Sequence, residues 1–201
     1  MALLSPAAAE LVRRRLEDSL SVKRDMLQSD CIQQAGLVAA VMIETLRAGG
    51  KILFFGNGGS SMDAGHLAAE LAGRFYYDRP GLAAVSLADG TASVTAIAND
   101  YSYEDVFARQ VRALGRPEDV AVGLTTSGNS GNVVNALIAA RDAGLVGVAL
   151  TGRTGGKAAA AADICIRVPT EDTPRVQEAC LHLGHTICEI VEREMFPPPY
   201  H

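Results

Sequence analysis

The chain has 201 residues, enough for one domain with a complete hydrophobic core. Apolar residues make up 48% of the chain and charged residues 20%, and the net charge is −5. This negative charge argues against a nucleic-acid surface, which normally carries a basic patch.

Neither a leader nor a membrane span is evident in the sequence. The opening MALLSPAAAELVRRR places its basic residues after the apolar ones, the reverse of a signal peptide. No stretch approaches the ~20 apolar residues that cross a bilayer. The cysteines lack metal or redox spacing and are expected to be reduced core thiols (Cys31, Cys165, Cys180 and Cys188). We therefore expect a cytoplasmic protein with no nucleic-acid or membrane partner.

Residues 6–48 are predicted to form two long helices, because apolar residues recur there at helical spacing. The pair Gly49–Gly50 should end the second helix. Two helices ahead of the first strand must pack their apolar residues against another surface, and we expect them to contribute to a subunit interface.

From residue 49 onward, short apolar runs alternate with helical segments. The predicted strands are apolar on both faces, as in a buried parallel sheet: Ile52–Phe55, Ala83–Leu87, Val120–Leu124, Val146–Leu150 and Ile164–Val168. Helices are predicted near 60–74, 91–98, 103–114, 131–143, 155–162 and 174–195. This alternation predicts an α/β fold with a doubly wound, five-stranded parallel sheet. We expect one domain over 1–201, with the helical pair in 1–48 and the core plus last helix in 49–196.

The loop after the first predicted strand reads GNGGSSMDAGH. Its glycines allow a ligand to approach the backbone, and Ser60 or Ser61 could cap the next helix. A helix start below such a loop can bind an anion or a polyol. The segment matches neither a P-loop nor GxGxxG, so a simple tight connection is equally open.

The loop after the third predicted strand reads TTSGNSGN and carries four hydroxyls within six residues. Hydroxyls, amides and the positive end of the following helix can together hold a phosphate, although a serine-rich cap is the alternative. The hydroxyls are those of Thr125, Thr126, Ser127 and Ser130. The pair Asn99–Asp100 is an ordinary turn unless it faces the same cleft.

Proton carriers occur on two predicted helices. Asp63, His66 and Glu70 share one helix face, where small apolar neighbours favour a desolvated carboxylate base; an exposed polar stripe is the alternative. On the last helix, Gln177 and His185 lie on a second face that is not charged and could point into a cleft or an interface. His182 falls on the charged, solvent side. Together His66, Glu70, Gln177 and His185 offer four possible metal ligands, but their spacing alone does not establish a metal.

The chain resembles the phosphoheptose isomerases, enzymes of the sugar isomerase (SIS) fold. The resemblance lies in GNGGSSMDAGHLAAE, AIANDYSYEDVFARQ, TTSGNSGNVVNAL and DTPRVQEACLHLGH, and with the leading helices it spans nearly the whole chain. It implies interconversion of sedoheptulose 7-phosphate and D-glycero-D-manno-heptose 7-phosphate through an enediol, in a homotetramer with sites at subunit interfaces. It also implies one zinc ion per subunit.

The resemblance implies a role for each matching residue. Glu70 and His185 would carry the acid–base chemistry, and the zinc ligands would be His66, Glu70, Gln177 and His185. Substrate binding would fall to Asn57, Gly58, Gly59, Asn99, Asp100, Thr125, Thr126, Ser127, Ser130 and Gln177. Two departures bear on which sugar fits: family members often read Ala-Ala-Asp-Ala-Gln-His where this chain has Met62 and Gly65, and Pro174 replaces an acid of some relatives.

Two other functions remain open at this point. One is a non-catalytic SIS module that binds a protein, as in the replication-initiator-associating proteins. The other is an isomerase of a different sugar phosphate, such as a pentose 5-phosphate. The joint presence of four candidate ligands and proton carriers favours an enzyme.

Overall fold

The computed structural model describes residues 5–197. The elements run α1 (Pro6–Leu27), α2 (Cys31–Arg47), β1 (Ile52–Gly56), α3 (Gly59–Ala72), β2 (Ala84–Ser86), α4 (Thr91–Asp100), η1 (Tyr103–Asp105), α5 (Val106–Leu114), β3 (Val120–Thr125), α6 (Gly131–Asp142), β4 (Val146–Thr151), α7 (Gly156–Ala161), β5 (Ile164–Arg167) and α8 (Thr173–Met195). The predictions made for residues 1–4 and 198–201, at the two ends of the predicted domain, lie outside the described residues.

The five strands form one parallel sheet in the order β2-β1-β3-β4-β5. The chain steps from β1 to β2 in one direction and then starts again on the other side of β1 with β3. Ligands of doubly wound sheets bind beyond the carboxyl ends of the strands at such a switch point. The loops that follow β1 and β3, which hold the glycines and the hydroxyls, therefore lie side by side.

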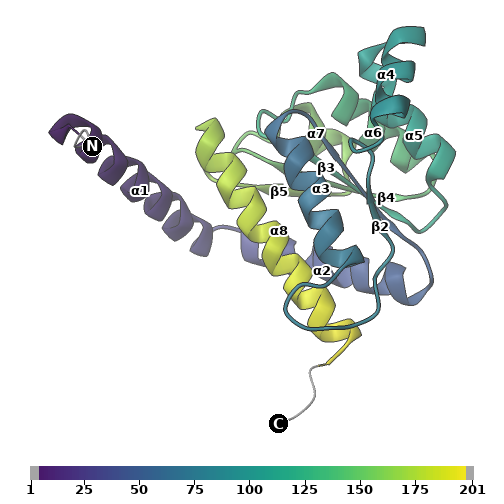
Figure 1. Cartoon of the computed structure of the whole chain (residues 1–201), viewed down its shortest axis with the longest axis horizontal. Coiled ribbons are helices and arrows are strands. Elements are labelled where there is room, and N and C mark those ends of the chain that lie inside the picture. The colour runs from purple at the N-terminus through teal and green to yellow at the C-terminus, as the bar shows by residue number, and fades with distance from the viewer. Residues whose placement is uncertain (1–4, 198–201) are drawn as a thin grey trace.

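Helices cover both faces of the sheet, which gives three layers (Figure 1). One core packs α2, α3 and α8 against alternate strand residues such as Ile52, Phe54 and Val122. The other core packs α5, α6 and α7 against the strand residues between them, such as Leu53 and Ala121. The strands are apolar on both sides because a different set of helices covers each face of the sheet and buries the strand residues there. The predicted doubly wound fold is confirmed.

Two details differ from the sequence prediction. The second strand is shorter than predicted and is not buried on both faces, since Val85 is 41% exposed. This strand forms the edge of the sheet, where one side has no neighbouring strand. The helix predicted at 103–114 is interrupted, because Ser102 caps a short 3-10 turn through its hydroxyl before α5 begins.

The N-terminal helix pair forms as predicted, and α1 projects from the body of the domain (Figure 1). Gly49 ends the pair with φ of +82°, which a glycine adopts without strain. Leucines along α1 remain in contact with solvent, among them Leu11, Leu16 and Leu20. Their place in a subunit interface stays a prediction. All four cysteines are free, and within residues 5–197 no helix is long and apolar enough to cross a membrane.

Candidate active site

The helices α3 and α8 lie side by side on one face of the sheet and run in the same direction (Figure 1). Gly184 of α8 allows their close approach, since a Cβ atom there would lie 2.7 Å from the side chain of Leu67. The second face of α8 predicted from the sequence therefore packs on α3 of the same chain. This packing brings residues more than 100 positions apart into contact.

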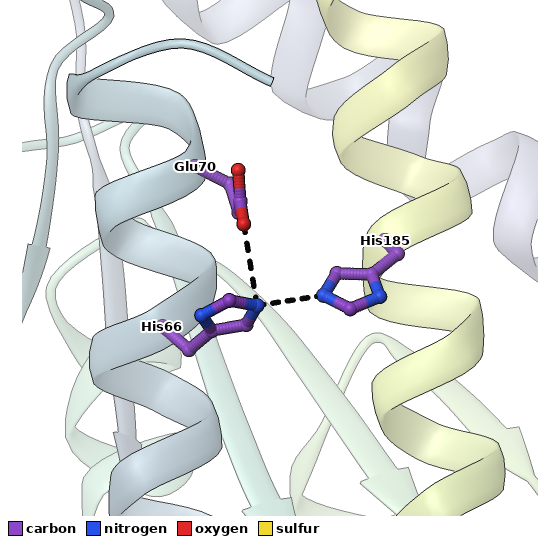
Figure 2. Close-up of side chains that lie close together, drawn as sticks. All are labelled: His66, Glu70 and His185. Atoms are coloured by element: carbon purple, nitrogen blue, oxygen red, sulfur yellow. Dashed lines mark hydrogen bonds and ion pairs between the residues drawn. The ribbon is translucent and has the colours of Figure 1, made fainter. Parts of the chain in front are cut away.

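Three of the predicted residues meet between these helices (Figure 2). His66 Nε2 lies 2.7 Å from His185 Nε2 and 3.2 Å from Glu70 Oε1. The two imidazole rings stand edge to face, at an angle of 71°. The Glu70 side chain is 21% exposed and that of His66 is 46% exposed, so a small molecule can reach the three groups from solvent. We call His66, Glu70 and His185 the trio.

Burial and the neighbouring imidazole of His66 lower the pKa of His185, so its ring is neutral at neutral pH and can accept or donate one proton. The buried carboxylate on the face of α3 that carries His66 and Glu70 is that of Asp63. Burial raises its pKa, against the opposing effect of a hydrogen bond from Gln177 Nε2, 2.9 Å from Asp63 Oδ2. A Cβ atom at Gly59, at the start of α3, would collide with the amide of Gln177, so a glycine leaves room for this side chain.

The trio is suited to a divalent metal ion. Its three ligand atoms all lie within 4.8 Å of one another. Two histidine nitrogens and a carboxylate oxygen are a typical donor set for zinc in enzymes, where the fourth position stays open for substrate. The donors present thus fit the ion that the resemblance implies, and the role of Gln177 as a further ligand stays a prediction.

The glycine loop after β1 leads directly into α3. Gly58, with φ of +56°, precedes the helix, and no side chain caps it. The prediction that Ser60 or Ser61 caps α3 is wrong, because Ser61 lies inside the first turn and its hydroxyl donates back to the Gly58 carbonyl at 2.7 Å. Amides of this first turn donate to carbonyls of the glycine loop, that of Ser60 to Asn57 at 3.0 Å and that of Ser61 to Gly58 at 3.1 Å.

The hydroxyl loop after β3 is joined to the glycine loop by side chains. Asn57 and Asn132 exchange two amide hydrogen bonds of 2.8 and 2.9 Å, and the Tyr103 hydroxyl donates to Asn57 Oδ1 at 3.0 Å. Within the hydroxyl loop, Thr125 and Ser130 are hydrogen-bonded at 3.1 Å. Ser130 stands at the start of α6 but does not cap it, so its hydroxyl is not committed to the helix.

A polar cavity of 280 Å³ lies beside the hydroxyl loop. Thr126 and Ser127 line it together with Arg153 and residues near the start of α8. Ser127 also accepts the amide of Asn129, which shapes the turn. The pair Asn99–Asp100 is hydrogen-bonded to itself and exposed at the end of α4, so its contact with substrate stays a prediction.

Comparison with known proteins identifies the family of this chain. The family model described as SIS domain matches residues 17–152. The chain is 44% identical over 188 residues to a phosphoheptose isomerase of Aneurinibacillus thermoaerophilus, covering 93% of this chain and 95% of that one. It is 54% identical over 155 residues to one from Paramagnetospirillum magneticum, covering 77% and 81%. The chain belongs to the phosphoheptose isomerase family.

A solved structure of a phosphoheptose isomerase from Neisseria gonorrhoeae supports the same assignment. It matches with a TM-score of 0.86 at 42% identity, covering 92% of this chain and 98% of that chain. The predicted family, the SIS fold and the prediction of a sugar phosphate isomerase are confirmed. A non-catalytic binding module is not what these relatives indicate.

Sequence reasoning missed several residues of this candidate site. Asn132 and Tyr103 hold Asn57, and neither stood out because they lie 75 and 46 positions from it in the sequence. Arg79 and Glu192 form a buried ion pair next to the trio, with side chains 2% and 0% exposed. Glu192 could have been found from its spacing, because it continues the face of Gly184 and Cys188 at four-residue steps.

The departures from the family pattern have structural explanations. A Cβ atom at Gly65 would lie 3.0 Å from Asp89 Oδ1, so a larger residue there requires Asp89 to move. Met62 is 67% exposed beside the glycine loop. Pro174 lies in the first turn of α8, where a missing amide hydrogen costs nothing. None of the three changes disturbs the trio.

Proposed function

We propose that this enzyme converts sedoheptulose 7-phosphate into D-glycero-D-manno-heptose 7-phosphate through an enediol. The observation that supports this most is the trio: a carboxylate and two imidazoles that meet across α3 and α8, in a chain of the phosphoheptose isomerase family. The two loops at the switch point of the sheet lie near enough for one extended sugar phosphate to contact both.

In this proposal the hydroxyl loop binds the phosphate. Thr125, Thr126, Ser127 and Ser130 supply hydroxyls, and the start of α6 supplies amides and the positive end of its dipole. The sugar hydroxyls would be bound by Asn57, Gly58, Gly59, Asn99, Asp100 and Gln177. Arg153 lines the cavity beside the loop together with Glu171, so the phosphate would be bound by hydroxyls and dipoles and not by a net positive charge.

The isomerisation moves one carbon-bound proton and one oxygen-bound proton. The Glu70 carboxylate takes a proton from carbon 1 of the open-chain ketose, and the electron pair forms the double bond of the enediol. His185 gives a proton to oxygen 2 and accepts the one on oxygen 1. Glu70 then returns its proton to carbon 2, which leaves the carbonyl at carbon 1. Each protein group ends in its starting state.

We also propose one zinc ion per subunit, held by His66, Glu70 and His185 with Gln177 as a further ligand. When bound, such an ion polarises the carbonyl and stabilises negative charge on the oxygens. The neutral state of His185, favoured by its lowered pKa, is the state in which imidazole binds a metal.

The proposed assembly is a homotetramer in which α1 and α2 contribute to the interfaces. The exposed leucines of α1 support this, since they form an apolar side on a helix that projects from the domain. We further propose that the enzyme works in the cytoplasm, where its four free cysteines remain reduced.

The test of the chemistry is Glu70→Gln, which keeps the shape of the side chain and removes its basicity. We expect turnover of sedoheptulose 7-phosphate to fall by about 10²–10⁴-fold. The matched control is Glu189→Gln, which alters a glutamate on the outer side of α8 and should leave turnover unchanged. Wild-type turnover by Glu70→Gln would contradict the proposal.

Proton exchange separates chemistry from binding. In deuterated water, the proton held by Glu70 exchanges with solvent in a fraction of turnovers, so wild-type enzyme should place deuterium on carbon 2 of the product, as followed by NMR, whereas Glu70→Gln should not. A panel of five-, six- and seven-carbon ketose phosphates tests the chain length of the substrate. Metal analysis of the purified enzyme tests the zinc assignment, with His66→Ala expected to lose the metal.

A further inference from the structure

We infer that Arg79 and Glu192 are positioning residues, which hold α3 and α8 at the separation and register that the trio needs. Their catalytic consequence rests on the proposed function. The geometric part of the inference stands on the contacts of the pair alone. We call Arg79 and Glu192 the clamp.

Glu192 lies on α8 and is completely buried. Its carboxylate accepts the amides of Phe75 and Tyr76, each at 2.7 Å, and Arg79 Nε at 3.0 Å. Both amides belong to the segment that leaves the end of α3. One carboxylate of α8 therefore fixes the backbone that follows α3.

Arg79 connects the same carboxylate to α3 itself. Its guanidinium donates to the carbonyls of Glu70 at 2.8 Å, Leu71 at 2.6 Å and Gly73 at 3.0 Å. The last carbonyls of a helix have no partner within it, and its last turn carries a partial negative charge. The last turn of α3 has no basic residue of its own, so Arg79 supplies both the donors and the charge.

These contacts reach the trio from two sides. The carbonyl of Glu70, the proposed base, is bound directly by Arg79. On the other side, the backbone held by Glu192 carries Phe75, whose ring lies 5.8 Å from the ring of His185. His185 and Glu192 are seven residues apart, which is two helical turns on one face of α8. The clamp thus sets both the position of Glu70 and the surroundings of His185.

Stability alone is a weak reason for such a pair. A buried ion pair often contributes no more than well-packed apolar side chains of the same volume, because both charges lose their hydration. The pair instead fixes an orientation, because the planar guanidinium donates to one carboxylate and to four carbonyls, those of Glu70, Leu71, Gly73 and Pro80. A lysine keeps the charge but has no planar fork, so it separates the two effects.

The test uses full-length Arg79→Lys and Glu192→Gln, with Arg193→Lys and Glu189→Gln as controls from an exposed ion pair on the same helix. We expect the clamp variants to lower kcat by about 10–100-fold, as for other residues that orient ligand side chains, while KM for sedoheptulose 7-phosphate changes by less than about threefold. The controls should match wild type in both constants.

Crystal structures of wild type and Arg79→Lys provide a readout independent of activity. We expect His66 Nε2 and His185 Nε2 to move apart by about 1 Å, a displacement that can cost a hundredfold in rate. If Glu192→Gln does not fold, Arg79→Lys alone decides. A folded Arg79→Lys with wild-type kcat, or with a reduced kcat and an unchanged separation, overturns the inference. If the wild-type enzyme itself shows no turnover, the proposed function fails and the separation still tests the clamp.

Discussion

Two buried carboxylates in this molecule have nearly the same surroundings, and both lie toward the side of the domain where the strands begin. Glu192 accepts two backbone amides and the side chain of Arg79. Asp119, just before β3, accepts the amides of Lys51 and Arg116 at 2.9 and 2.8 Å and Lys51 Nζ at 2.6 Å. Each carboxylate holds a loop that enters or leaves a regular element.

The difference lies in what each loop carries. Asp119 holds the backbone of Lys51 and Arg116, just before β1 and β3, and neither residue contacts or belongs to the trio. Glu192 holds the backbone that follows Glu70 and includes Phe75. The same chemistry should therefore support stability alone in one place, and stability together with catalysis in the other.

The largest effect is expected for Glu192→Ala, which leaves the Arg79 guanidinium buried without its carboxylate. Breaking a buried pair in this way costs about 3–5 kcal/mol of unfolding free energy. Urea unfolding followed by circular dichroism measures this loss. A loss below about 1 kcal/mol would contradict the role of the pair in holding the segment after α3.

A smaller loss is expected for Asp119→Ala. Because two backbone amides lose their acceptor, we expect the free energy of unfolding to fall by about 1–3 kcal/mol. The Lys51 side chain adds little to this loss, since it is 27% exposed and can reach water. Turnover per folded molecule should stay within about twofold of wild type. Equal damage to kcat by Asp119→Ala and Glu192→Gln would erase the distinction between the two carboxylates.

The sequence was sufficient to predict the arrangement of elements. Each strand from Ile52 to Arg167 begins and ends within two residues of its prediction, because short apolar runs bounded by glycine, aspartate or proline indicate buried parallel strands. The second strand was the least accurate, because its pattern is apolar although it lies at an edge where Val85 reaches solvent. A local pattern of apolar residues does not indicate whether a strand lies at the centre or at the edge of the sheet.

Those parts of the candidate site whose residues share one face of a helix could be predicted from the sequence. His66 and Glu70 share a face, and His185 lies on the uncharged side of the last helix, so both halves of the trio could be read from spacing. Their meeting depends on the close packing of α3 and α8 at Gly184. Glu192 could have been found from its spacing, but its pairing with Arg79 could not be predicted, since Arg79 lies in a loop 113 positions earlier.

The pH dependence of stability provides another way to compare Glu192 with Asp119. Burial alone would raise the pKa of each carboxyl, but the amides and the cation beside it outweigh burial and hold the pKa below its ordinary value, 4.5 for Glu192 and 3.8 for Asp119. A lowered pKa in the folded state stabilises the fold above the ordinary value, and this stabilisation is lost as pH falls through the folded value.

We therefore expect the contribution of these two carboxyl groups to the free energy of unfolding to be level from pH 7 to about 5 and to fall below pH 4.5. The double variant Arg79→Met/Glu192→Gln removes one of the two carboxylates without leaving a buried charge, so its decline between pH 4.5 and 3 should be shallower than that of wild type. Asp63, whose raised pKa acts in the opposite sense, is present in both proteins and cancels. Identical slopes would mean that Glu192 is protonated normally in the folded protein.

The smallest effect is expected for the exposed pair on the same helix. Arg193 Nη2 lies 2.9 Å from Glu189 Oε1, a contact as short as those of the clamp, yet the Arg193 side chain is 54% exposed. Water and salt screen this pair, so Arg193→Ala should cost about 0.3–0.5 kcal/mol, and less in 1 M salt. Urea unfolding at two salt concentrations measures both values. A loss close to that of Glu192→Ala would mean that burial is not what distinguishes the clamp.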